Sequence, residues 1–555
     1  MAIFFVINEL PPEERFKPEN LIMAGLWGSH EKPHPNIFLQ AVHAEVADLR
    51  KGFEVNVNGL AVSVLVKVIP LWCTAHAPAK AAFLNLKSHM GYSSCPKCLI
   101  EGEKSDETGD VMVFPHQDIL PPRNEENYQV QLNTVYQMRK EKRVSKKESP
   151  SFQGVKGPTL LSYMLVFCLF KTTGIDSMHC LFLGVLKQLL ILWFDTKFKD
   201  EPFTLHRKLK QVNDLLLGLQ LPHFVERNFV PVDKTDFMKA SVLRNLFFYA
   251  LLPVMQTVME NEYFSNLVDL VKGVSLLNTD SVSAADIELS DKILTRFCKN
   301  FQMLYGKRHM SSNVHLLRHL PSCVQELGPL QIVSCFGLEG ANGKLANLAH
   351  GTRHAGLQIA KHLSILSDLA GKIEKLPDGI AKTYCEQLMY KWKRFNIRDK
   401  ISADLFVIGS YDSNSVYIQD IEDRLSELYS GMFHVLTFSR LYKRKLIYVT
   451  SSYSRGSRNS SVVHYMHDSQ YFYGEALCFF SVYLPTHCEP DVYCYIRRAQ
   501  VLPFSENIDI PHIVRCSYMN GTIDIVPVRN LETVCFRVNA KVLFFSKPLN
   551  KHELE

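Results

Sequence analysis

Two short motifs that lie far apart in the chain most constrain its fold. His315 and His319 are four residues apart in NVHLLRHLP, so on a helix both imidazoles project from the same face. Cys95 and Cys98 form a CxxC motif in GYSSCPKCLIEG, with Pro96 between the thiols in a segment typical of a tight turn. Pairs of thiolates and imidazoles at these spacings are the ligands that tetrahedral zinc prefers in proteins.

Together the two motifs predict one closed Cys2His2 zinc site, and closed sites are structural rather than catalytic. The ligand pairs of a zinc finger lie about a dozen residues apart. Here a long stretch of chain separates Cys98 from His315, so the ion would join two distant parts of a large domain. Two alternatives remain open from spacing alone: a lone CxxC is often incidental or redox-active, and HxxxH is often a pair of surface imidazoles.

Glu339 is the next acidic residue of interest, in the segment SCFGLEGANGKL. The small residues around it predict the beginning of a helix that faces a pocket. A carboxylate placed there can help to hold Mg²⁺ for in-line attack on a phosphodiester, a task that needs two or three converging carboxylates. The alternative is a buried or helix-capping glutamate with no catalytic role.

A series of longer segments places these motifs in a wider context. In chain order they are INELPPEERFKPENLIMAGLW (Ile7 to Trp27), KPHPNIFLQ (Lys32 to Gln40), APAKAAFLN (Ala77 to Asn85), CPKC, GVKGPTLL (Gly154 to Leu161), GIDSMHCLFLGVLKQLL (Gly174 to Leu190), LYGKRHMSSNVHLLRHLP (Leu304 to Pro321) and GPLQIVSCFGLEGANGKL. Through them the chain, from Ile3 to about Leu363, resembles the transposases of the animal branch of the CACTA (En/Spm) superfamily. Those proteins share a catalytic plan with Transib transposases and the V(D)J recombinase core.

The resemblance implies a fold and a set of site residues. The fold is an RNase H-like domain with an Asp, Asp, Glu triad, interrupted by a helical insertion and braced by CxxC and HxxxH zinc ligands. Position by position, the zinc ligands match Cys95, Cys98, His315 and His319, and the final catalytic glutamate matches Glu339.

The two catalytic aspartates of the family are not matched. The second heads a DLPAK-like segment, which here reads HAPAK with His76 in its place, and the first is expected upstream of Met1, as in a chain truncated at its amino terminus. Imidazole is a poor substitute for a hard oxygen ligand of Mg²⁺. We therefore expect a degenerate, inactive enzyme with structural Zn²⁺, and Mg²⁺ only where catalysis is retained. The alternatives are an active DNA transposase and a host-adopted DNA- or protein-binding protein.

Composition agrees with an intracellular globular protein, nuclear or cytoplasmic. The chain has 555 residues, 46% of them hydrophobic, which is enough for two or three domains. Its net charge of +6 permits DNA as a partner without arguing strongly for it. The longest apolar run, Leu181 to Phe194, is too short for a membrane span. We expect neither a membrane nor a small-molecule substrate, and family members that pair two DNA ends suggest a homo-oligomer.

The fold class predicted is α/β, with an RNase H-like core interrupted by a large all-helical insertion and followed by a small β-rich domain. Residues 1–101 are expected to form part of the core, with a helix at NIFLQAVHAEVADLRKG and a buried hairpin at FEVNVNGLAVSVLVKVIPLW. Residues 154–310 read as helices, beginning with LLSYMLVFCLF, and Asp176 with His179 is interpreted as the start of a buried helix rather than a metal site. Residues 311–400 complete the core, and residues 401–555 read as antiparallel strands.

Residues 102–153 read as a polar, basic linker. Its basic run predicts either contact with nucleic-acid phosphates or a nuclear import signal, whereas the alternative is a solvated helix face. The candidate residues are Arg139, Lys140, Lys142, Arg143, Lys146 and Lys147.

Overall fold

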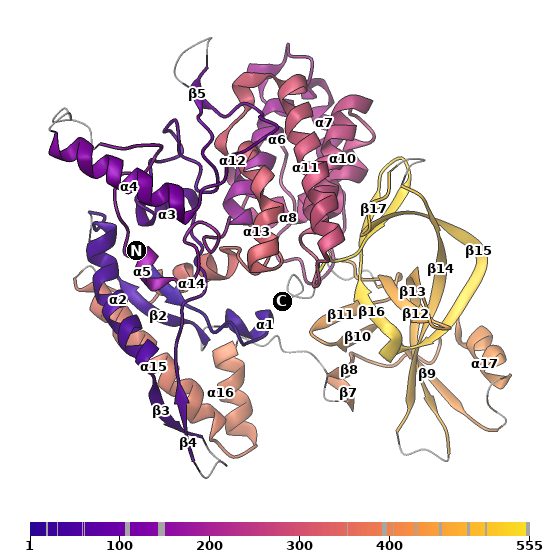
Figure 1. Cartoon of the computed structure of the whole chain (residues 1–555). Coiled ribbons are helices and arrows are strands. Elements are labelled where there is room, and N and C mark those ends of the chain that lie inside the picture. Colours follow the sequence, from indigo (N-terminus) through magenta and orange to yellow (C-terminus); the bar gives the residue numbers. More distant parts are fainter. Residues whose placement is uncertain are drawn as a thin grey trace. The chain divides into compact units, whose positions relative to one another are not determined.

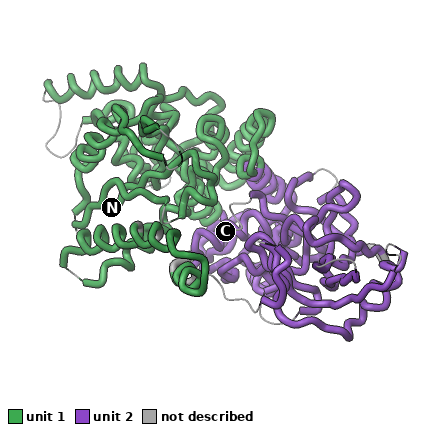
Figure 2. The backbone as a smooth tube through the Cα atoms, turned by 90° about the horizontal axis from the view of Figure 1, so that it is seen from below, with its two compact units in different colours: residues 1–188, 276–389 green, residues 189–275, 390–555 purple. Residues whose placement is uncertain are grey.

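The computed structural model describes residues 1–17, 20–29, 31–57, 59, 62–105, 111–141, 150–351, 353–390, 397–402, 404–427, 429, 431–453, 458–485, 489–504 and 508–550. The chain divides into two compact units, coloured separately in Figure 2. Unit 1 comprises residues 1–188 and 276–389, and unit 2 comprises residues 189–275 and 390–555. The segment 154–310, predicted as one helical insertion, therefore contributes helices to both units.

Unit 1 combines many helices with short antiparallel strand pairs. Its described strands pair as β1 with β2, β3 with β4, and β5 with β6. The strands are β1 (Ala2–Phe5), β2 (Ile22–Leu26), β3 (Phe53–Asn56), β4 (Ser63–Val66), β5 (Glu103–Lys104) and β6 (Met112–Val113). These pairs establish a mixed helical and antiparallel architecture, and the RNase H-like core stays a prediction.

In Figure 1, β3, β4 and β5 lie at the edges of unit 1, which is built mainly of helices. In chain order the helices are α1 (Pro12–Arg15), α2 (Pro35–Lys51), α3 (Ala77–Phe83), α4 (Glu125–Lys140), α5 (Leu161–Met164), the π-helix η2 (Met178–Leu186), which runs on into α6 (Lys187–Phe194) at the unit boundary, α11 (Ala284–Tyr305), η7 (Lys307–His309), α12 (Ser312–Leu316), η8 (Leu317–His319), α13 (Leu320–Leu327), α14 (Phe336–Ala346), α15 (Ala355–Glu374) and α16 (Ile380–Tyr390).

Local sequence explains where several of these helices begin and end. α2 forms where apolar periodicity predicts it, with Pro35 in its first turn and Gly52 at φ 99° after its last residue. α11 begins at a capping box in which Ser283 accepts from the amide of Asp286 and the Asp286 carboxylate accepts from the amide of Ser283. α11 then packs against η8 and α13, so the short HxxxH segment is anchored against a long helix.

Two sequence predictions in unit 1 are wrong in detail. LLSYMLVFCLF is helical only over α5, because Leu165 leaves the helix with an extended backbone. The hairpin β3–β4 forms as predicted but is not buried in a sheet centre, since most of its side chains are exposed, including Leu65. Apolar content there does not mark a core position.

Unit 2 joins a helical segment to the β-rich part of the chain. The helices and turns are η3 (Thr196–Phe198), η4 (His206–Lys208), α7 (Leu209–Leu217), η5 (Thr235–Phe237), α8 (Ala240–Asn245), the π-helix η6 (Leu246–Ala250), α9 (Leu251–Met255), α10 (Asn261–Leu276), α17 (Ile418–Ser426) and η9 (Val528–Asn530). The strands are β7 (Ile397–Ser402), β8 (Leu405–Ile408), β9 (His434–Phe438), β10 (Arg440–Lys443), β11 (Leu446–Val449), β12 (Val462–His467), β13 (Gln470–Tyr483), β14 (Asp491–Leu502), β15 (Ile513–Pro527), β16 (Leu531–Val534), β17 (Phe536–Asn539) and β18 (Leu543–Ser546).

The strands of unit 2 form two antiparallel sheets. One has four strands in the order β11-β10-β8-β7, and the other has eight, in the order β16-β12-β13-β14-β15-β18-β17 with β9 paired to β13. The helical segment packs on the larger sheet, since the ring of Tyr249 stacks on Phe536 with centroids 4.2 Å apart. The prediction of a β-rich carboxyl-terminal region is confirmed.

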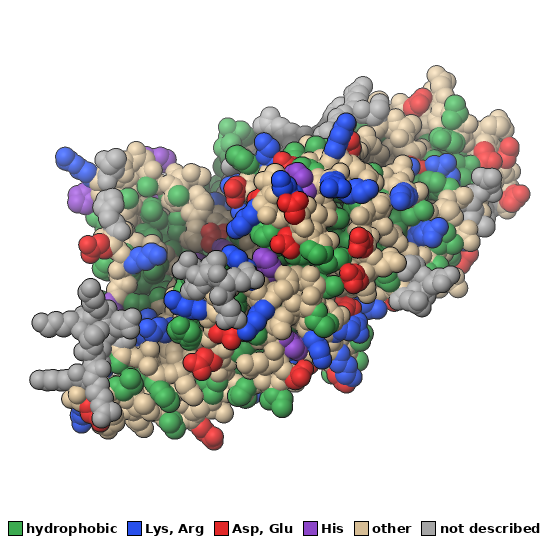
Figure 3. Space-filling view, turned by 90° about the horizontal axis from the view of Figure 1, so that it is seen from above, with side chains coloured by type: hydrophobic (Ala, Val, Ile, Leu, Met, Phe, Trp, Pro, Cys, Tyr) green, Lys and Arg blue, Asp and Glu red, His purple; other side chains and the backbone are tan. Residues whose placement is uncertain are grey.

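In the described part of the chain, no helix is both long enough and apolar enough to cross a bilayer. On the face drawn in Figure 3, acidic and basic side chains are interspersed.

Candidate metal centre

The CxxC motif forms a tight knuckle held by backbone hydrogen bonds. The amide of Lys97 points at the Sγ of Cys95, 3.4 Å away, as expected for an N–H facing a thiolate. The amide of Leu99 donates to the carbonyl of Pro121, at 2.8 Å, which fixes the chain just after the second cysteine. Both thiols are buried, Cys98 completely.

Arg123 stabilises the knuckle through hydrogen bonds to its backbone. Its guanidinium is buried and donates to three backbone carbonyls: from Nε to that of Cys95 at 2.8 Å, and from Nη2 to those of Gln153 at 2.7 Å and Ser93 at 3.2 Å. Nη1 reaches the Oε1 of Gln131 at 3.3 Å. Burial lowers the pKa of Arg123. Nothing in the spacing of the sequence identifies this arginine, because its partners are carbonyls that only the fold brings together.

The histidines come from a segment far from the CxxC motif in the sequence. His315 lies in α12, and His319 ends η8 and precedes α13. The ring of His315 stacks on Phe114, and the amide of Phe114 donates to the carbonyl of Met310 at 2.7 Å. The strand β6 is thus tied to the approach of the HxxxH helix.

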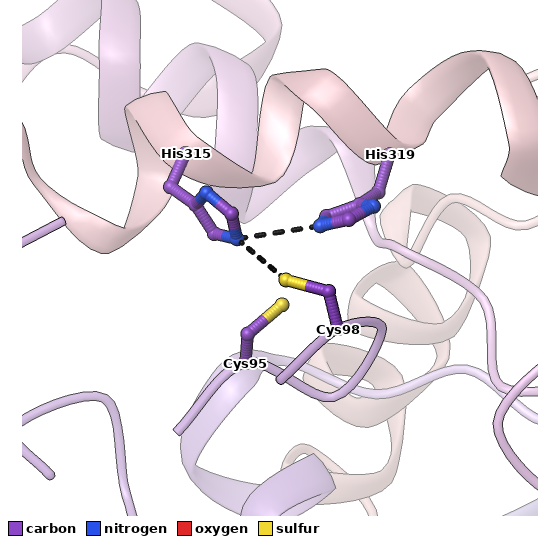
Figure 4. Close-up of side chains that lie close together, drawn as sticks. All are labelled: Cys95, Cys98, His315 and His319. Carbon is purple, nitrogen blue, oxygen red and sulfur yellow. Dashed lines mark hydrogen bonds between the residues drawn. The ribbon is translucent and has the colours of Figure 1, made fainter. Parts of the chain in front are cut away.

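The four side chains converge, as Figure 4 shows. The Nε2 of His315 lies 3.4 Å from the Sγ of Cys98, across 217 residues of sequence, and 3.3 Å from the Nε2 of His319. All four ligand atoms lie within 4.8 Å of one another. A tetrahedral ion with bonds of about 2.0–2.3 Å separates its ligand atoms by roughly 3.3–3.8 Å. The donor set and its spacing therefore fit a metal ion such as zinc, and burial on all sides makes the site structural.

The electrostatics of the tetrad favour a thiolate. Burial alone would raise the pKa of Cys95, but the hydrogen bond from Cys98 and the nearby imidazoles of His319 and His315 outweigh it, so the pKa lies well below its usual value. The same hydrogen bond raises the pKa of Cys98, with burial adding to the effect. The pair thus holds one thiolate readily, which is the form that binds metal.

A second group of polar side chains gathers where three segments of unit 1 meet. Cys73 and Thr173 form a parallel bridge, and the hydroxyl of Thr74 donates to the carbonyl of Val333 at 2.7 Å. These contacts bring together His76, Asp176, His179 and Glu339, which we call the dihistidine cluster. The cluster includes both positions, His76 and Glu339, that the resemblance assigns to the catalytic triad.

Asp176 organises this cluster from a buried position. Its Oδ1 accepts from the amide of Met178 at 3.1 Å and from the amide of Cys335 at 2.9 Å, so one carboxylate caps the starts of η2 and α14. Its Oδ2 bonds the Nδ1 of His179, and this hydrogen bond raises the pKa of His179. The interpretation of Asp176 as the start of a buried helix is confirmed.

His76 and Glu339 complete the cluster. Burial lowers the pKa of His76, and the neighbouring His179 lowers it further, whereas Glu339 and Asp176 raise it. Glu339 lies in the first turn of α14, as the sequence predicted, and its side chain is exposed. Its negative charge also raises the pKa of His179, so the carboxylate lies near both imidazoles.

The basic run is only partly within the described residues. Arg139 and Lys140 end α4, where Arg139 donates to the carbonyl of Lys156 at 2.7 Å and Lys140 lies over the ring of Tyr136. Lys142, Arg143, Lys146 and Lys147 lie outside the described residues. The nucleic-acid prediction for this run stays a prediction.

Comparison of the chain with protein-family models and with curated proteins found no match.

Proposed function

We propose that this chain is a transposase-derived protein of the CACTA type, in which structural zinc holds an RNase H-like recombinase fold that no longer cuts DNA. The observation that carries the proposal is the buried tetrad of Cys95, Cys98, His315 and His319. Two motifs separated by 217 residues meet in one site, in the pairing that the family resemblance implies.

The dihistidine cluster supports the same proposal. Two segments far apart in sequence, one bearing His76 and the other Glu339, are joined by the hydrogen bond from Thr74 to Val333, as two positions of one catalytic triad would be. An imidazole at His76 replaces the hard oxygen ligand that Mg²⁺ requires. Loss of strand cleavage follows from that single change of ligand chemistry.

The retained role is then binding, to DNA or to another protein, in the nucleus or the cytoplasm. A net charge of +6 is compatible with contact to phosphates, and a homo-oligomer would suit a protein descended from enzymes that pair DNA ends. In this role the metal serves stability: it links the knuckle to the helices α12 and α13, so that binding of zinc contributes directly to folding.

The first test is zinc stoichiometry on the purified full chain. Elemental analysis should give about one tightly held zinc per chain, lost in Cys95→Ser and in His319→Ala together with a lower unfolding midpoint. Cys385→Ser and His89→Ala are matched controls, because both residues are described and lie outside the tetrad. A folded chain without zinc, or variants that keep it, would overturn the proposal of a zinc-held fold.

A second candidate, an active transposase, is favoured by one observation, the exposed carboxylate of Glu339 within the dihistidine cluster. Supercoiled plasmid incubated with the chain in Mg²⁺ or Mn²⁺ distinguishes the two. We expect the wild-type chain to nick no more than Glu339→Gln does. Nicking that Glu339→Gln abolishes would establish the active enzyme and refute the loss of cleavage.

A further inference from the structure

The two imidazoles of the dihistidine cluster lie nearly as close together as the pair in the zinc centre, although their planes meet at a different angle. The ring centroids of His76 and His179 are 5.6 Å apart with planes tilted by 38°. The rings of His315 and His319, which share one site, have centroids 5.0 Å apart. Two imidazoles with centroids at this separation can both reach one metal ion once their ring nitrogens turn towards it.

His179 is already oriented as a metal ligand. Its Nδ1 is engaged by the carboxylate of Asp176, which leaves Nε2 as its free ring nitrogen. Metal-binding histidines usually show this arrangement, in which a carboxylate fixes the ring and makes the free nitrogen more basic. The amides of Met178 and Cys335 hold Asp176 itself in place.

The third ligand group is the carboxylate of Glu339. It lies in the first turn of α14. This helix begins directly after Cys335, whose amide donates to Asp176. Because its side chain is exposed, it can rotate towards the two rings without disturbing packed neighbours. The nearby Lys80 is largely buried, and its positive charge lowers the pKa of both Asp176 and His179.

We propose that His76, His179 and Glu339 form a second metal site, which binds one divalent transition-metal ion such as Zn²⁺ or Co²⁺ and excludes Mg²⁺. Two imidazoles and one carboxylate suit zinc, cobalt or iron, whereas Mg²⁺ takes oxygen ligands in near-octahedral geometry. Three protein ligands leave coordination positions open to solvent, unlike the closed tetrad. Among the described residues, the Cys2His2 tetrad is the group whose ligand atoms already lie within 4.8 Å of one another. In the second site the ligand atoms are farther apart, so its side chains must move together when the ion binds. The inference rests on geometry and holds whether or not the chain descends from a transposase.

Cobalt binding to the full chain loaded with one equivalent of zinc, which fills the tetrad, tests the proposal. Cobalt in the tetrad has thiolate ligands and shows an intense thiolate-to-metal absorption, whereas cobalt in the second site lacks it. We expect a second ion per chain, bound without that absorption and not displaced by excess Mg²⁺. His76→Ala and His179→Ala should each weaken the second ion at least about tenfold, while the tetrad keeps its zinc.

Three further variants separate ligation from a loss of structure. Asp176→Asn keeps an oxygen to accept from the two amides but removes the charge behind His179, and should weaken the second ion about 10- to 100-fold. Glu339→Gln removes the third ligand from an exposed side chain, and His89→Ala is the matched control. A chain that binds no second ion, or one whose second ion is held equally well by His76→Ala, His179→Ala and Glu339→Gln, would overturn the proposal. Because the zinc of the tetrad is measured in the same samples, failure of the second site is distinguished from failure of the zinc-held fold.

Discussion

Replacing Arg123 by alanine should weaken the zinc centre although Arg123 touches no metal ligand atom. The guanidinium holds the carbonyls of Cys95 and Gln153 at 2.8 and 2.7 Å. Hydrogen bonds from a charged donor are worth about 1.5–3 kcal/mol each, so losing these two costs roughly 3–6 kcal/mol. Removing a buried charge returns part of its desolvation cost, which leaves a net destabilisation of roughly 2–4 kcal/mol.

The zinc affinity should fall with the stability, because the carbonyl of Cys95 is part of the knuckle that presents both thiolates. Loss of a supporting contact of this kind typically weakens a metal site about 10- to 100-fold. Arg123→Lys keeps the charge but lacks the planar fork that reaches several carbonyls at once, so its effect should be intermediate.

Zinc affinity is measured by competition with a chromophoric chelator on the full chain, and stability by urea unfolding of the zinc-loaded protein. Arg139→Ala is the control, since Arg139 also donates to a backbone carbonyl but at the exposed end of α4. The reasoning would be refuted by Arg123→Ala holding zinc within about twofold of the wild type and unfolding at the same urea concentration.

Two further predictions follow from local geometry. Gly154→Ala should destabilise the knuckle and lower zinc affinity, because a Cβ there would lie 1.8 Å from the carbonyl oxygen of Ser93 and Gly154 has a φ of +83°. Gly343→Ala in α14 is the comparison: a Cβ there meets nothing within 4 Å, so the change should be neutral or stabilise the protein by about 0.5–1 kcal/mol. Urea unfolding and chelator competition measure both variants. Burial lowers the pKa of His512 from 6.5 to about 4 in the folded chain. Between these values the unfolded chain binds a proton that the folded chain does not, so the free energy of unfolding should decrease by about 1.4 kcal/mol for each unit that the pH falls from 6.5 to 4. From pH 7 to pH 5 the unfolding midpoint should decrease less for His512→Gln than for the wild type. An equal decrease would contradict the lowered pKa of His512.

The sequence predicted the metal ligands better than the residues that hold them in place, because metal ligands recur at characteristic spacings along the chain. CxxC and HxxxH each place two donors on one local element, so Cys98 and His315 could be paired before any fold was known. Arg123 and Gly154 leave no such mark, since the role of each is defined by carbonyls such as that of Ser93, which only the tertiary structure brings near.

Secondary structure was predictable where pattern and capping agreed. α2 has apolar periodicity and a glycine at its end, and it forms where expected. LLSYMLVFCLF has apolar content without period or caps, and only Leu161–Met164 is helical. The π-helix η2 was not foreseen either, because its extra residue per turn depends on packing against α12 rather than on residue type.

The zinc centre and the dihistidine cluster are connected through one helix, so a change in one site can affect the other. η2 begins at Met178, whose amide donates to Asp176, and it carries His179. It packs along α12, where the Sγ of Cys180 lies 3.6 Å from the carbonyl of Asn313, two residues before His315. Freeing α12 by removing the zinc therefore loosens the element that positions His179. Loss of the tetrad should weaken both metal sites, whereas loss of His179 should affect only one. This asymmetry is expected for a structural ion beneath a solvent-facing site, because loss of the His179 ring leaves the carboxylate of Asp176 in place at the start of η2.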